Sequence, residues 1–84
     1  MMMENVKKVL NFLASQERDE LGDTWISGAD ILAGMDMIPR DINDALEIAI
    51  NRGWVKERGV RNKRPVKFAL VMINAEGRLW IENV

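Results

Sequence analysis

The sequence predicts a small α+β domain, with helices in its first half and a pair of strands near its end. Two segments, residues 6–13 and 42–50, repeat apolar residues at three- and four-residue steps, which is typical of one face of a helix. Phe68–Ile73 is a continuous apolar run of strand length. Between the two expected strands lies a basic connector (residues 58–67) with five Lys or Arg residues and no acid. The predicted order is α-β-α-α-β-β-α in one domain, residues 1–84.

Composition supports a core-forming protein and excludes several classes. The chain has 84 residues, is 48% hydrophobic and has a net charge of −1, so disorder is not expected. Its longest apolar run, Phe68–Ile73, is far shorter than the roughly 18 residues that span a bilayer, and its start lacks a signal-peptide pattern. Without cysteine there is no disulfide and no thiolate metal site. We expect a soluble cytoplasmic protein with no membrane contact.

The first half predicts three helices. The first should run from about Glu4 to Arg18, and a short extended piece, residues 23–26, should follow. Ser27 is a suitable N-cap for a short helix from Gly28 to about Ala33, with Asp30 as its capping-box-like partner. This helix should bury Leu32 with Ala29 or Ile31. The residues expected in the core from the first helix are Val6, Val9, Leu10 and Leu13.

The second half predicts one long helix, two strands and a last short helix. Pro39 suits the first turn of a helix that continues to Arg52, and Gly53 suits its left-handed stop. Strands are expected at 54–58 and 66–73. Asn74 can cap a final helix, 75–82, that packs Leu79 with Trp80 or Ile81 beside it. The third helix should bury Ile42, Ala45, Leu46, Ala49 and Ile50.

Three segments resemble a known family. They are Trp25-Ile26-Ser27 before the second helix, Asn51-Arg52-Gly53-Trp54-Val55 after the third, and Met72-Ile73-Asn74-Ala75-Glu76-Gly77-Arg78-Leu79. In these segments the chain resembles the winged helix-turn-helix domains of bacterial and archaeal transcription regulators, over roughly Glu4 to Glu82. The last segment is similar to the strand-to-helix joint, often Leu-Thr-x-x-Gly, of many such regulators. The resemblance implies a three-helix core with a helix-turn-helix at about 27–53, a two- to three-stranded antiparallel wing at about 54–73, and a short C-terminal helix.

Charge is strongly partitioned along the chain. Residues 17–36 contain six acids and one base, whereas residues 56–67 contain six bases and one acid, Glu57. Such a chain can hold a polyanion at one end and repel it at the other. The alternative is a solvated surface whose two halves attract each other between copies.

The resemblance implies that the third helix enters the major groove of DNA and that the wing lies on the neighbouring backbone. On the exposed face of this helix, Arg40 and Asn43 are suited to guanine and adenine, and Asn51 can add limited readout. Asp44 and Glu47 on the same face oppose the approach of phosphates. The wing residues expected to contact nucleic acid are Arg58, Arg61, Asn62, Lys63, Arg64 and Lys67, with Asn62 reaching a minor-groove base edge. A merely solvated hairpin tip is the alternative.

Catalysis is not expected. The chain has no histidine, cysteine or tyrosine, which removes the commonest general bases, thiol nucleophiles and zinc ligands. The acidic cluster between Glu17 and Asp23 lacks a calcium- or magnesium-loop pattern. We expect no enzyme activity, no cofactor and no metal. Trp25, Trp54 and Trp80 are expected in or near the core rather than as a stacking platform for bases.

The apolar strand raises the question of partners. Residues 68–73 are apolar on both faces, so Val71 and Ile73, or the opposite set, need cover from the first helix, the tail or a second copy. We expect a homodimer formed through this strand and the terminal helix, acting on double-stranded DNA as a transcription regulator. Two other functions stay open. One is a protein-interaction module, in which Asp44 and Glu47 dock a basic partner or the basic wing docks an acidic one, and the other is RNA binding.

Overall fold

The structure, a computed structural model, describes residues 2–16 and 24–83. In this part of the chain four helices and three strands follow the predicted order. They are α1 (Met2–Ser15), β1 (Ile26–Ser27), α2 (Gly28–Gly34), α3 (Pro39–Asn51), β2 (Val55–Arg58), β3 (Leu70–Ile73) and α4 (Ala75–Glu82). The α+β class is confirmed.

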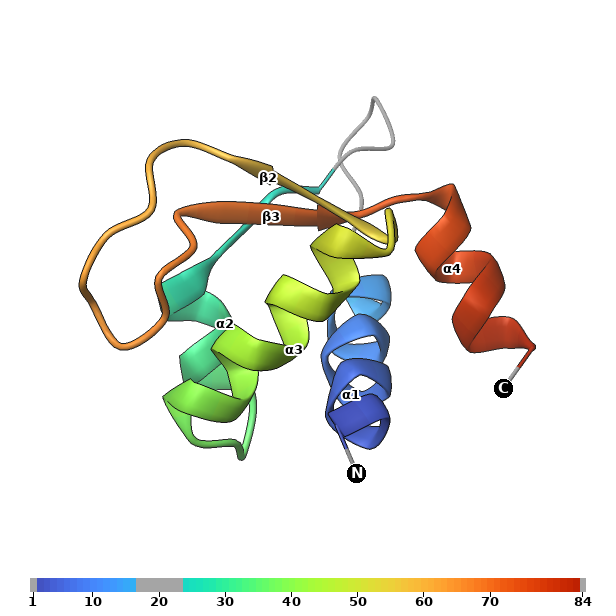
Figure 1. Cartoon of the computed structure of the whole chain (residues 1–84), viewed down its shortest axis with the longest axis horizontal. Coiled ribbons are helices and arrows are strands. Elements are labelled where there is room, and N and C mark those ends of the chain that lie inside the picture. The colour runs from blue at the N-terminus through green and yellow to red at the C-terminus, as the bar shows by residue number, and fades with distance from the viewer. Residues whose placement is uncertain (1, 17–23, 84) are drawn as a thin grey trace.

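The three strands form an antiparallel sheet in the order β1-β3-β2, with β3 in the centre. The sheet lies across the three-helix unit, and α4 and the connector lie at its opposite ends (Figure 1). Strand β3 is shorter than the predicted 66–73, because only Leu70–Ile73 pair with the neighbouring strands. The backbone groups of the residues before it form hydrogen bonds outside the sheet. The N–H of Lys67 donates to the side chain of Asn43, and the carbonyl of Ala69 accepts from the N–H of Gly28. Val66 and Phe68 nevertheless bury their side chains.

The core lies between the sheet and the helices. Helix α1 contacts α3, α4 and β3, so the predicted cover for Val71 and Ile73 comes from the first helix. All the core residues predicted for α1 are buried, as are Ile42, Ala45, Leu46 and Ala49 of α3. Ile50 is only partly buried. In α2, Gly28 and Ile31 are buried and Leu32 is partly buried, whereas Ala29 is exposed.

Helix α1 ends at Ser15, three residues before the predicted Arg18, which lies outside the described residues. The side chains of Ser15 and Gln16 both donate to the carbonyl of Phe12. These bonds use a carbonyl that a continuing helix would have paired with a backbone N–H. The acidic cluster of residues 17–23 also lies outside the described residues.

The predicted helix signals are confirmed. The Oγ of Ser27 accepts from the N–H of Asp30 at 3.0 Å, and Pro39 occupies the first turn of α3. Gly53 has φ of 77°, the left-handed conformation expected after α3. Asn74 caps α4, with its Oδ1 accepting from Gly77 N–H at 2.9 Å.

The prediction for the buried face of α4 was wrong for Leu79 and right for Trp80 and Ile81. Leu79 is 52% exposed, whereas Trp80 and Ile81 pack against the core. Gly77 is the buried residue of α4 and faces Trp54, and residues three and four positions after it share its face. Trp80 therefore stacks on Trp54, with ring centroids 4.3 Å apart, so both rings lie near the core as predicted. Trp25 is half-buried.

We expect Asn74→Ala to destabilise the fold by about 1–2 kcal/mol, because it removes the N-cap of α4 and a second side-chain hydrogen bond. Its Nδ2 also donates to the carbonyl of Gly53 in the turn before β2. Asn74→Asp keeps the cap acceptor but loses this donor, so its stability should lie between those of wild type and Asn74→Ala. Urea unfolding followed by circular dichroism measures the order. Equal losses in both variants would show that the cap contributes nothing.

Within residues 2–16 and 24–83, no helix has the length and apolar character that crossing a membrane requires.

Candidate nucleic-acid interface

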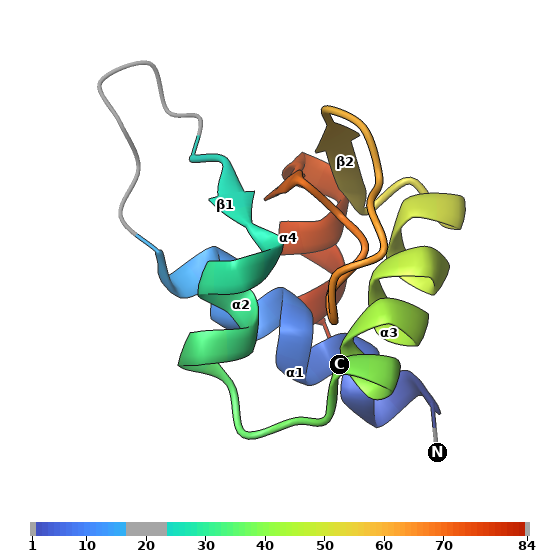
Figure 2. The same ribbon diagram turned by 90° about the vertical axis from the view of Figure 1, so that its left-hand side faces the viewer.

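Most of the residues predicted to contact nucleic acid lie near the place where the connector meets α3, whereas Arg58, the last residue of β2, lies over Trp25. The connector leaves the end of β2, descends beside α2 and α3, and returns to β3 (Figures 1 and 2). Arg40 and Asn43 lie in the N-terminal half of α3, whereas Asn51 is its last residue. The structure thus brings the first half of α3 together with the connector and leaves Asn51 at the other end of the helix.

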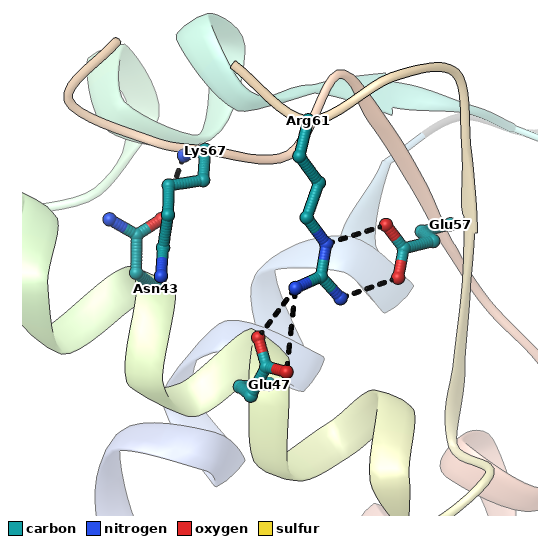
Figure 3. Close-up of polar contacts among 5 residues, drawn as sticks. All are labelled: Asn43, Glu47, Glu57, Arg61 and Lys67. Carbon is teal, nitrogen blue, oxygen red and sulfur yellow. Dashed lines mark hydrogen bonds and ion pairs between the residues drawn. The ribbon is translucent and has the colours of Figure 1, made fainter. Parts of the chain in front are cut away.

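Asn43 holds the connector to α3. Its Nδ2 donates to the carbonyl of Pro65 at 2.7 Å, and its Oδ1 accepts from the N–H of Lys67 at 2.9 Å. The side chain of Lys67 runs back from the connector beside Asn43 (Figure 3). Because one amide donor and the amide oxygen are used in this way, Asn43 cannot offer its paired donor and acceptor to adenine while the bonds persist. Base reading by Asn43 stays a prediction that requires the connector to move.

Arg61 is the centre of a second link. Its Nε and Nη2 donate to the two carboxylate oxygens of Glu57 at 2.9 and 2.7 Å, and its Nη1 donates to Glu47 on α3 at 3.1 Å (Figure 3). The guanidinium carbon lies 4.5 Å from the ring centroid of Phe68, which is only 1% exposed. Arg61 therefore joins the end of β2, the connector and α3 above a buried aromatic ring.

These contacts shift two pKa values. The hydrogen bond from Arg61 lowers the pKa of Glu57 below its ordinary value, with the positive charge of Arg61 acting in the same direction. The hydrogen bond to Glu57 raises the pKa of Arg61, and the negative charges of Glu47 and Glu57 raise it further. Each group thus stabilises the charged form of the other.

The lowered pKa of Glu57 predicts that acid loosens the connector. A carboxyl group with a depressed pKa in the folded state stabilises that state above its ordinary value of 4.5, and the contribution is lost as pH falls through the lowered value. We expect the Nε–H signal of Arg61 in NMR spectra to change in a transition below pH 4.5. Glu57→Gln should remove this transition. A transition unchanged by Glu57→Gln would contradict the assignment.

Four connector cations are left available. Arg58, Lys63, Arg64 and Lys67 are exposed, and none forms an ion pair with an acidic residue in the described part of the chain. Arg58 also lies over the ring of Trp25, 5.7 Å from its centroid. Lys63 and Arg64 lie in the turn of the connector, and Lys67 lies beside Asn43. These are the side chains that can meet an anion without breaking an internal bond.

Asn62 shapes the turn that carries Lys63 and Arg64. Its Oδ1 accepts from the N–H of Arg64 at 2.8 Å, and its own N–H donates to the carbonyl of Lys67 at 2.9 Å. An asparagine oxygen that bonds the backbone two residues later forms an Asx turn. Its predicted contact with a minor-groove base stays a prediction, for which both Nδ2 donors are left.

The structure changes the interpretation of the acidic face of α3, which Asp44 and Glu47 form. Glu47 and Asp44 both opposed a phosphate-rich partner in the sequence, but Glu47 is paired with Arg61. Asp44 is exposed and has no ion pair with a described basic residue. Sequence reasoning did not assign a role to Glu57 or Phe68. A signal for Glu57 was present, since it is the one acid between Lys56 and Lys67.

Among the described residues, the candidate site offers no metal-binding group and borders only a small pocket. No group of three metal-ligating side chains comes together among them. A small pocket of about 190 Å³ separates α2 from the connector, lined in part by Leu32, Arg64 and Val66. The site is therefore an exposed basic surface beside a small pocket. No family model, no curated protein and no solved structure matches this chain.

Proposed function

We propose that this chain is a winged-helix protein that binds double-stranded DNA and acts as a transcription regulator. The observation that carries the proposal is the set of exposed connector cations without ion pairs, next to the N-terminal half of α3. In this proposal α2 and α3 form the helix-turn-helix, and β2, the connector and β3 form the wing. The order of elements and the antiparallel sheet support this assignment.

The wing supplies affinity by neutralising phosphates. Cations that replace condensed counterions make binding salt-dependent, with a slope of about 0.9 in log affinity on log salt per phosphate. If Arg58, Lys63, Arg64 and Lys67 each meet one phosphate, the slope is about 3.6. Arg40, exposed on the N-terminal half of α3, is the side chain best placed to read guanine.

The test is fluorescence anisotropy of a labelled random-sequence duplex, titrated with the protein at several salt concentrations. Micromolar binding that weakens steeply with salt supports the proposal. Unlabelled double-stranded RNA and single-stranded DNA serve as competitors. An absence of binding at low salt contradicts the proposal, and stronger competition by RNA redirects it to RNA.

A homodimer is part of the proposal, because two half-sites multiply a modest affinity. Leu79 of α4 is exposed, and Leu70 and Met72 of β3 are half-buried on the outer face of the sheet. These apolar side chains are consistent with the predicted strand and terminal-helix surfaces. Size-exclusion chromatography with light scattering measures the mass, and a monomer at DNA-binding concentrations contradicts this part.

The protein-docking alternative was motivated by the acidic residues Asp44 and Glu47. It is weakened because Glu47 is already paired with Arg61. Asp44 is left to discriminate the two functions. Asp44→Lys should strengthen non-specific duplex binding by a DNA-binding protein. A docking module would gain nothing from this change in the anisotropy assay.

A further inference from the structure

The connector is fastened to α3 at two points. Asn43 bonds the backbone of residues 65 and 67, and Arg61 bonds Glu47. On the other side, toward α2, a pocket of about 190 Å³ remains. The polar links on the α3 side, together with the buried side chain of Val66 against Gly28 of α2, set where the basic turn lies.

Arg61 is poorly placed to meet a phosphate. Its three guanidinium nitrogens already donate to carboxylates, two to Glu57 in a bidentate pair. One face of the group covers Phe68. Such paired, planar contacts are the ones for which arginine is best suited. A phosphate would have to displace a carboxylate from a bond that is already made.

Local charge points the same way. Arg61, Glu47 and Glu57 together carry one positive and two negative charges, a net charge of −1. Lys63, Arg64 and Lys67 carry three positive charges and form no ion pair among the described residues. A polyanion is therefore attracted to the turn that carries Lys63 and Arg64, and is repelled from the region around Glu47 and Glu57.

We propose that Arg61 is a positioning residue, which locks the connector onto α3 so that DNA meets one fixed surface formed by the N-terminal half of α3 and residues 63–67. The inference rests on the proposed function and changes the role first predicted for Arg61. A connector that is ordered before binding avoids the entropy cost of ordering it on DNA. Loss of the lock lowers affinity without removing a phosphate contact.

Two variants of Arg61 distinguish positioning from phosphate contact. Arg61→Ala should weaken duplex binding several-fold while the salt slope stays at the wild-type value. Arg61→Lys keeps the charge but loses the bidentate fork, so it should bind about as weakly as Arg61→Ala. The matched control, Lys63→Ala, should lower the slope by about 0.9. A similar drop in slope for Arg61→Ala, with recovery of affinity in Arg61→Lys, would overturn the proposal.

A second measurement uses the free protein and does not depend on DNA. The N–H groups of Asn62 and Lys67 are both hydrogen-bonded within the locked connector. Their hydrogen exchange should be faster in Arg61→Lys than in wild type, whereas Lys63→Ala should leave it unchanged. Unchanged exchange in Arg61→Lys would show that no lock exists. If exchange accelerates but the wild type binds no duplex, the lock stands and the proposed DNA function fails.

Discussion

The double variant Lys63→Ala, Arg64→Ala is expected to bind random-sequence duplex on the order of 50- to 100-fold more weakly than wild type at 0.1 M salt. Each of the two cations is expected to neutralise one phosphate, so their removal lowers the slope of log affinity on log salt by about 1.8. Both side chains are exposed, and neither forms an ion pair in the described part of the chain. The fold should therefore keep its stability, which thermal unfolding can verify.

The matched control is Lys7→Ala, Lys8→Ala. Both lysines are exposed on α1, and the change in net charge is the same. Because they lie away from the connector, we expect the salt slope to stay at its wild-type value. Equal reductions of affinity in the two double variants would mean that binding follows net charge alone, and the basic turn would then have no special role.

The sequence was sufficient for most of the fold. Apolar spacing identified the core faces of α1 and α3, and Ser27, Gly53 and Asn74 act as the caps and stops that their chemistry predicts. These signals are local, so a single chain reveals them. The end of α1 and the start of β3 were misplaced, because side-chain bonds to the backbone replace the regular pattern there. Such side-chain-to-backbone bonds do not produce a repeating pattern in the sequence.

The site was only partly predictable. Clustered charge identified the basic connector, but the links that hold it join residues far apart in the sequence. Asn43 and the Lys67 backbone are 24 residues apart, and Glu47 and Arg61 are 14 apart. Which polar residues pair across such distances depends on the path of the connector. Sequence reasoning therefore counted Asn43 and Arg61 as free to meet DNA, whereas the structure engages both.

The face of α4 depends on Gly77. In the sequence this glycine was one position of a segment that resembled a known joint, and Leu79 was expected in the core. In the structure Gly77 is buried against the turn before β2. The absence of a side chain allows α4 to lie close to Trp54, and this approach turns Trp80 and Ile81 inward.

Gly77→Ala is expected to destabilise the protein by about 2 kcal/mol, although helix propensity alone predicts a gain of about 1 kcal/mol. A Cβ at this position would clash with the carbonyl oxygen of Trp54 and would lie 2.8 Å from Cγ1 of Ile73. The same carbonyl oxygen of Trp54 accepts a hydrogen bond from the N–H of Asn74, so it cannot move away freely. For a domain of this size the loss corresponds to a fall in Tm of roughly 8–16 °C, measured by circular dichroism.

The control is Glu76→Ala on the exposed side of the same helix, which should change stability by no more than about 0.5 kcal/mol. Stabilisation by Gly77→Ala would show that α4 does not approach the Trp54 turn as closely as described. Below its unfolding transition the Gly77→Ala variant should retain the salt slope of wild type, since α4 and the connector lie at opposite ends of the sheet (Figure 1). Stability and DNA contact are therefore separable in this chain: Gly77 supports the first, and Lys63 and Arg64 the second.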